Sequence, residues 1–119
     1  MKEYTREELT EALQVIDSTI KNCEKMQPKF KEGTSQHTLL KKRIKALYIS
    51  KLLMENETAM ERYTKEELIE VIRPISSIIS KCENGQLKHS EGTTYYTRFK
   101  KIIDAMYIAK SLITDEINR

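Results

Sequence analysis

Apolar residues recur at helical spacing in two long stretches of the chain. In each stretch the apolar positions step by four and three residues in alternation. The two sets are Leu9, Leu13, Ile16, Ile20 and Cys23, and Leu68, Ile72, Ile75, Ile79 and Cys82. This spacing places the apolar side chains on one face of an α-helix. We therefore predict two amphipathic helices, each of which packs this face against a partner.

Helix start signals precede both stretches. Thr5 is followed three residues later by Glu8, and Thr64 is followed in the same way by Glu67. A threonine and a glutamate at this spacing form a capping box, in which each side chain bonds to the other residue's backbone amide. Both helices are therefore predicted to begin directly after these threonines.

A turn and a second apolar pattern follow each of these helices. The turns carry the triplet EGT at residues 32–34 and 91–93, and a helix is expected to begin directly after each triplet. The expected apolar faces are Leu40, Ile44, Leu47, Tyr48 and Met54, and Phe99, Ile103, Met106, Tyr107 and Ile113. We thus expect Tyr48 and Tyr107 to pack in the core. Pro74 falls inside the third helix, which it should kink or split.

The two halves of the chain align without a gap when the sequence is shifted by 59 residues, which pairs Tyr4 with Tyr63. We interpret this match as a tandem duplication, with internal repeats 4–60 and 63–119 in a single domain, 1–119. One helical hairpin cannot bury its apolar face alone, whereas two hairpins can cover each other. The predicted fold is all-α, a four-helix bundle built from two tandem helical hairpins related by a pseudo-twofold axis.

Composition agrees with a helical protein. The 119 residues are 39% hydrophobic and 33% charged, with a formal net charge of +3. This balance is typical of globular chains and does not mark a nucleic-acid binder. The first residues, MKEYTREEL, lack the apolar segment of a signal peptide, and the apolar runs are too short to span a membrane. We expect a cytoplasmic protein with no membrane partner.

The pattern CEK…K..EGTSQHTLLKKRIKALYISK, which lies within residues 23–51, resembles that of short bacterial helical-hairpin proteins about one repeat long, a group without an established activity. The resemblance covers both halves and so nearly the whole chain. It implies a helical hairpin and a bacterial cytosol, and it implies no catalytic or binding residue. The second half departs from the pattern at Tyr95, Tyr96, Arg98 and Asp104.

Residues suited to catalysis or metal binding are sparse. Cys23 and Cys82 continue the apolar faces, which favours buried, free thiols over nucleophiles. His37 and His89 each align with a residue of another type in the other half, so neither belongs to a repeated site. No cluster combines histidine, cysteine and carboxylates at metal-binding spacing. We predict no catalytic, metal or cofactor site, and hence a protein that is not an enzyme.

The EGT[ST] segments are candidate anion sites. A helix N-terminus presents unpaired N–H groups and the positive end of the helix dipole. The candidate residues are Gly33, Thr34, Ser35, Lys41 and Lys42 in the first half, and Gly92, Thr93, Thr94, Lys100 and Lys101 in the second. A glycine followed by threonine is also the usual way to enter an N-cap. We favour the plain cap over an anion site.

The segment KKRIK, residues 41–45, is a local basic cluster that raises nucleic acid as a partner. The second half replaces Arg43 with Ile102 and Lys45 with Asp104. A solvated helix face is therefore the favoured interpretation.

Ile49 and Ile108 fall among lysines on a helical wheel and form a candidate contact surface, either within the bundle or between subunits. Our first hypothesis is a non-enzymatic bundle that acts through protein contacts, as an adaptor, a regulator or a dimer. Its partner would be an unidentified protein or a second copy of the chain. The alternative is anion or nucleic-acid binding through the EGT[ST] helix starts and the basic face of the second helix.

Overall fold

The computed structural model describes residues 3–55 and 61–119. Over these residues the chain forms the helices α1 (Arg6–Met26), α2 (Ser35–Met54), α3 (Lys65–Gln86) and α4 (Thr94–Ile117), with a short 3-10 turn, η1 (Gln27–Lys29), after α1. The predicted all-α class with four helices is confirmed. Among these described helices, none is both long and apolar enough to span a membrane.

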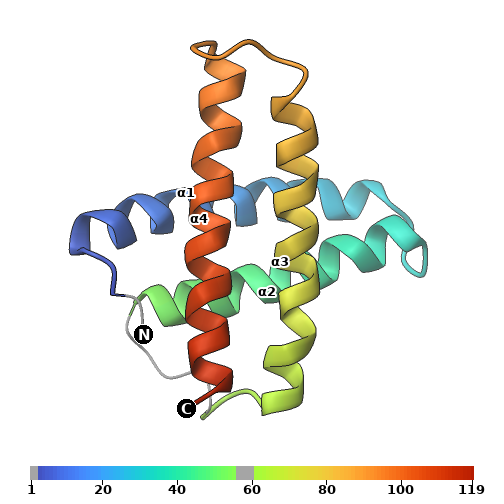
Figure 1. Cartoon of the computed structure of the whole chain (residues 1–119). Coiled ribbons are helices and arrows are strands. Elements are labelled where there is room, and N and C mark those ends of the chain that lie inside the picture. Colours follow the sequence, from blue (N-terminus) through green and yellow to red (C-terminus); the bar gives the residue numbers. More distant parts are fainter. Residues whose placement is uncertain (1–2, 56–60) are drawn as a thin grey trace.

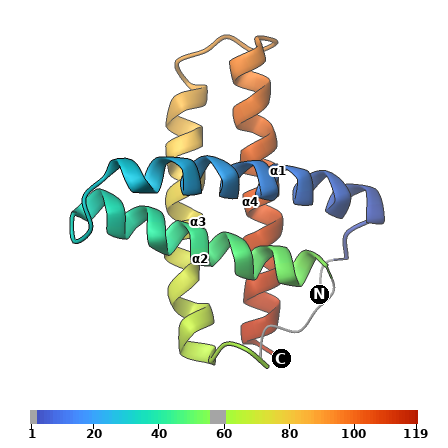
Figure 2. The same ribbon diagram turned by 180° about the vertical axis from the view of Figure 1, so that it is seen from behind.

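The helices form two hairpins that cross each other. The hairpin of α1 and α2 lies against the hairpin of α3 and α4, and the two run crosswise (Figures 1 and 2). The molecule measures 40 × 38 × 19 Å along its principal axes. Because a helix with its side chains is about 10 Å across, the short axis corresponds to two stacked layers. The pseudo-twofold relation between the hairpins stays a prediction.

The predicted helix starts are confirmed. The Thr5 hydroxyl accepts a hydrogen bond of 3.0 Å from the Glu8 amide, and the Glu8 carboxylate accepts one of 3.0 Å from the Thr5 amide. Thr64 and Glu67 form the same reciprocal pair, at 3.1 and 3.0 Å. Each box satisfies two amides that the first turn of a helix would otherwise leave unpaired.

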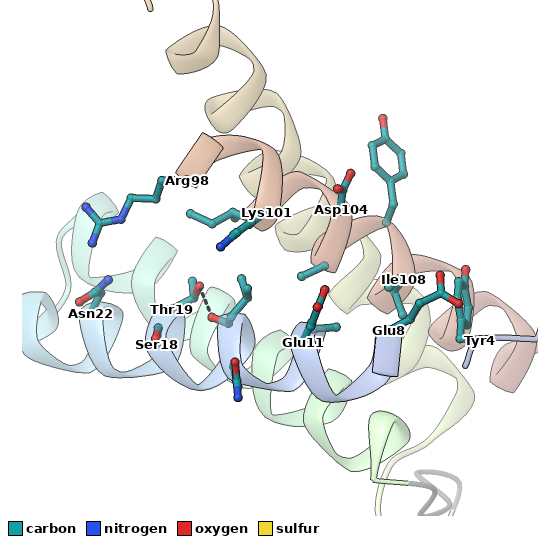
Figure 3. Close-up of a pocket in the computed structure, with 16 residues that line it drawn as sticks. Tyr4, Glu8, Glu11, Ser18, Thr19, Asn22, Arg98, Lys101, Asp104 and Ile108 are labelled. Carbon is teal, nitrogen blue, oxygen red and sulfur yellow. Dashed lines mark hydrogen bonds between the residues drawn. The ribbon is translucent and has the colours of Figure 1, made fainter. Parts of the chain in front are cut away.

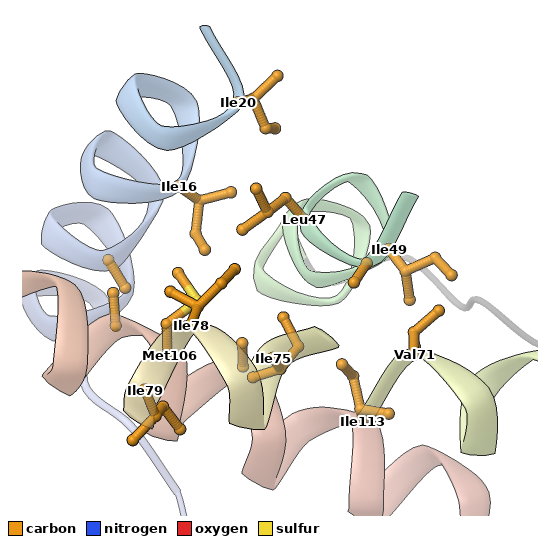
Figure 4. Packing of buried hydrophobic residues seen from close by; sticks show 14 of the residues in the cluster. Ile16, Ile20, Leu47, Ile49, Val71, Ile75, Ile78, Ile79, Met106 and Ile113 are labelled. Carbon is orange, nitrogen blue, oxygen red and sulfur yellow. The ribbon is translucent and has the colours of Figure 1, made fainter. Parts of the chain in front are cut away.

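A single apolar cluster draws side chains from all four helices (Figure 4). Ile16 and Ile75, in the middle of the two predicted faces, are both fully buried. Small residues are also buried on α2 and α4, which contact each other: Ala46, Ser50, Ala105 and Ala109. Small side chains at a crossing allow two helix backbones to approach closely.

The expected core position of Tyr48 and Tyr107 is wrong. Their side chains are 41% and 49% exposed, and the Tyr48 hydroxyl donates a hydrogen bond of 3.0 Å to the Glu24 carboxylate. Ile49, the next residue, is instead fully buried. The cause is the crossed packing, because α2 contacts α1, α3 and α4 and so buries a wider face than the apolar pattern indicates. Ile49 therefore cannot belong to a surface for contact between subunits, whereas Ile108 is half-buried.

Pro74 does not split α3. The helix runs without interruption from Lys65 to Gln86, and Pro74 is buried within it. A proline removes one backbone hydrogen bond and crowds the preceding turn, which is why a kink or a split was expected. The neighbouring residues Val71, Ile75 and Ile78 are all buried, and their packing stabilises the helix on both sides of the proline.

Candidate functional site

A groove of about 690 Å³ lies between α1 and α4 (Figure 3). Most of its rim is exposed, so the groove is open to solvent. The lining residues come from the start and middle of α1 with Tyr4, and from the first half of α4: Tyr4, Glu8, Glu11, Ala12, Gln14, Val15, Ser18, Thr19, Asn22, Arg98, Lys101, Ile102, Asp104, Ala105, Tyr107 and Ile108.

Apolar side chains form the base of the groove. Ala12 and Ala105 are buried, at 4% and 2% exposure, whereas Val15, Ile102 and Ile108 are half-buried. The last three pack against the main core and still line the groove. The base is therefore continuous with the protein interior, and a ligand covering it would remove apolar surface from water.

Charged residues divide the rim into two ends of opposite sign. Arg98 and Lys101 extend from α4 above Asn22 and Thr19, while Glu8 and Glu11 lie toward the start of α1 (Figure 3). We call these the basic end and the acidic end.

The charges on the rim differ in whether they are already paired. Asp104, also on the rim, pairs with Lys100 at 3.0 Å. Within residues 3–55 and 61–119, no hydrogen bond or ion pair involves the side chains of Arg98, Lys101 or Glu11. These three charges are exposed and remain available to a ligand.

Two polar links join α2 to α3. Lys45 Nζ lies 2.9 Å from Glu67 Oε2, and Arg43 Nη2 donates a hydrogen bond of 3.1 Å to Ser77 Oγ. The Glu67 pKa is lowered first by the hydrogen bond from the Thr64 amide and then by Lys45, and the hydrogen bond to Glu67 raises the Lys45 pKa. Both links join α2 directly to α3.

The polar links between α2 and α3 have no counterpart at the aligned positions, 59 residues apart, on α4 and α1. Asp104 on α4 aligns with Lys45 on α2, and Glu8 on α1 aligns with Glu67 on α3. Two carboxylates cannot form the ion pair that joins α2 to α3. Ile102 replaces Arg43, which removes the second polar link. Of the described residues, none on α1 forms a hydrogen bond or an ion pair with α4.

Side-chain size adds to this difference. Ile78 on α3 is buried, at 4% exposure, and packs into the core. Its equivalent on α1 is Thr19, which is half-buried and lines the groove. The Thr19 hydroxyl donates to the Val15 carbonyl at 2.7 Å, so it bonds within its own helix. A shorter, self-bonded side chain fills less of the space beside α4 than an isoleucine would.

The EGT[ST] segments act as helix caps. Gly33 and Gly92 have φ angles of 91° and 90°, a left-handed conformation that favours glycine. Thr34 Oγ1 accepts from the His37 amide and donates to the Lys31 carbonyl, and Thr93 Oγ1 does the same with Tyr96 and Ser90. Both hydroxyls are thus occupied by the chain itself. The two turns lie at the separate tips of the crossed hairpins, so they do not form one site (Figures 1 and 2).

We expect Thr34→Ala and Thr93→Ala each to lower the free energy of unfolding by about 1 kcal/mol, because each removes a cap. Urea denaturation monitored by circular dichroism measures this change. Ser35→Ala and Thr94→Ala are matched controls on the next, exposed residues and should stay within about 0.5 kcal/mol of the wild type. Equal losses from the caps and the controls would contradict the capping role.

The basic cluster of α2 does not form one exposed face. Arg43 is buried, at 8% exposure, and its Nε has no hydrogen-bond partner among the described residues. Lys45 is paired with Glu67. Only Lys41 and Lys42 of the predicted set on this helix remain exposed and outside an ion pair within the described ranges. The expectation that Arg43 contributes to a surface for nucleic acid is wrong, because its position in the crossed hairpins lies under α3.

The cysteines are buried and free. Burial raises the pKa of both the Cys23 and the Cys82 thiol, and nearby cationic side chains oppose this only in part. A raised pKa keeps each thiol protonated and therefore poorly nucleophilic. In the described part of the chain, no three histidine, cysteine or carboxylate side chains gather as metal ligands do.

The groove was not predicted as a site, although Lys101 and Ile108 were among the candidate residues and do line it. Glu8, Glu11, Arg98 and Tyr107 line the groove but were not among the predicted site residues. The sequence feature that could have indicated the groove is a difference in size or charge between aligned residues of the two halves, such as Thr19 with Ile78 and Asp104 with Lys45.

Comparison of the chain with protein-family models, with curated proteins and with solved structures finds no match.

Proposed function

We propose that this protein is a non-enzymatic interaction module that binds a helical segment of a partner protein in the α1/α4 groove. The observation that carries the proposal is the open groove itself, with an apolar base and unpaired charges on its rim. A protein interface usually combines an apolar centre with a polar, solvated rim in the same way.

The length of the groove favours a polypeptide segment. Its α1 wall extends from Glu8 to Asn22, which at 1.5 Å per residue is about 21 Å. A partner helix of about 14 residues has this length, and an amphipathic helix commonly binds by laying its apolar face in such a groove. Tyr107, 49% exposed on the α4 wall, is of the residue type that often contributes most to binding.

The charge distribution favours a protein over nucleic acid. A phosphate backbone is neutralised by several lysines and arginines that face it together. Here the groove carries acidic as well as basic residues, Arg43 is buried, and Lys45 and Lys100 are held in ion pairs. Binding of nucleic acid or of a free anion therefore has less support.

Blocking the groove tests this function. Thr19→Trp places a large ring in the groove, whereas Thr10→Trp makes the same change on an exposed position of α1 outside it. The two threonines are matched, because each hydroxyl donates to the carbonyl four residues earlier, at 2.7 and 2.8 Å. Both variants and the wild type would be immobilised, and the proteins that each captures from the source cells identified by mass spectrometry.

We expect wild type and Thr10→Trp to capture a protein that Thr19→Trp does not. Photo-crosslinks from that protein should map to α1 and α4. Circular dichroism checks that both variants remain folded. Capture of the same proteins by all three forms would refute the groove as the binding site.

A further inference from the structure

We infer that the groove selects the charge order of its partner. The bound helical segment carries acidic side chains over Arg98 and Lys101 and basic side chains over Glu8 and Glu11. This inference rests on the proposed function, because it concerns the partner of the same groove.

The basic end is suited to a carboxylate. Arg98 and Lys101 both line it, and neither is neutralised by another described residue. A guanidinium can bind a carboxylate through two parallel hydrogen bonds. Ser18 and Asn22 line α1 opposite these cations and, within residues 3–55 and 61–119, their side chains also make no hydrogen bond. An acidic side chain placed here would meet two cations and two further donors.

The acidic end is suited to a lysine or arginine. The Glu8 carboxylate is fixed by the hydrogen bond that it accepts from the Thr5 amide. Glu11 is one turn further along α1 and is unpaired among the described residues. Residues three apart on a helix are neighbours, so the two carboxylates repel each other and a cation between them relieves this repulsion. Asp104 adds little negative charge to the acidic end, since its carboxylate is paired with Lys100.

The order of charges excludes partners as well as favouring them. A segment with the opposite order would set acidic side chains against Glu8 and Glu11 and basic ones against Arg98 and Lys101. Repulsion between like charges in an interface weakens the binding of a wrong partner. The apolar base then supplies general affinity, while the two ends decide which segment binds and in which position.

The test is selection from a displayed library of 18-residue amphipathic helical peptides in which only the polar positions vary. Parallel selections use the wild type, Arg98→Glu with Lys101→Glu, and Lys41→Glu with Lys42→Glu. The last pair is a matched control, because it reverses two exposed charges outside the groove. Binding of selected peptides to each form, and to Thr19→Trp and Thr10→Trp, is then measured by fluorescence anisotropy.

We expect peptides selected on the wild type to carry acidic residues at one end and basic residues at the other. Charge reversal at Arg98 and Lys101 should weaken the binding of these peptides at least about tenfold. Selection on this variant should yield peptides with basic residues at the formerly acidic end. Reversal of Lys41 and Lys42 should leave both results unchanged.

Three outcomes separate this inference from the proposed function. In the first outcome, Thr19→Trp abolishes binding of the selected peptides, so they need the open groove, but the peptides show no order of charges. This result overturns the inference alone. Peptides weakened equally by the two charge reversals also overturn it, since they respond only to net charge. Selection of no peptide, or only of peptides that bind Thr19→Trp and Thr10→Trp equally, overturns the proposed function as well.

Discussion

Replacement of Ile16 or of Ile75 by alanine is expected to lower the free energy of unfolding by about 2 to 5 kcal/mol. Both side chains are fully buried, at 0% exposure, and both belong to the shared core of the two hairpins (Figure 4). Alanine removes three carbon atoms from each site, and the tight packing around it prevents the cavity from closing fully.

Chemical denaturation with a two-state fit measures these losses. Ile69→Ala is the matched control, because Ile69 lies on α3 with its side chain 53% exposed. This control should change stability by less than about 0.5 kcal/mol. A loss below about 1 kcal/mol for both buried isoleucines would mean that the core lies on another face of α1 and α3.

The features predicted correctly from the sequence are local ones. A capping box depends on residues three apart, so Thr5 with Glu8 and Thr64 with Glu67 could be recognised without the fold. The apolar faces of α1 and α3 likewise follow from the helical repeat alone. Since each of these helices presents one apolar stripe, its buried side could be assigned before its partners were known.

Features that depend on how the hairpins cross could not be predicted. The apolar pattern of α2 indicates one face, but three other helices contact this helix. That packing buries Ile49 and Arg43 and leaves Tyr48 exposed, with its hydroxyl bonded to Glu24. Nothing within α2 distinguishes Arg43 from the exposed lysines beside it. Arg43 is buried where it meets α3 and donates a hydrogen bond to Ser77, 34 residues away.

The groove is a third kind of feature, since it could have been suspected from differences between the halves. Identical pairs indicate similar helices in the two halves, whereas the aligned pairs Thr19 with Ile78 and Asp104 with Lys45 differ in size or charge. Whether such a difference opens a groove depends on which helices meet. The sequence does not give that pairing, and the structure places α1 beside α4 and α2 beside α3.

Separation of the two hairpins is expected to abolish cooperative folding. The fragments 1–60 and 61–119 would each expose the face that the other hairpin now covers, because the core draws on all four helices. Helices of about 20 residues are only marginally stable in water without tertiary packing. Circular dichroism melts should therefore lack a cooperative transition, or analytical ultracentrifugation should show that a fragment self-associates to cover its exposed face.

Mixing the fragments distinguishes loss of packing from a general failure to fold. If mutual burial supplies the stability, an equimolar mixture should regain a cooperative melt, and its midpoint should rise with concentration because assembly is now bimolecular. The intact chain is the control, since its midpoint should not depend on concentration. A monomeric 1–60 fragment that melts cooperatively on its own would show that one hairpin is a complete folding unit. The core around Ile16 and Leu47 would then not need the second hairpin, although α3 and α4 supply more than half of the buried apolar residues within 3–55 and 61–119.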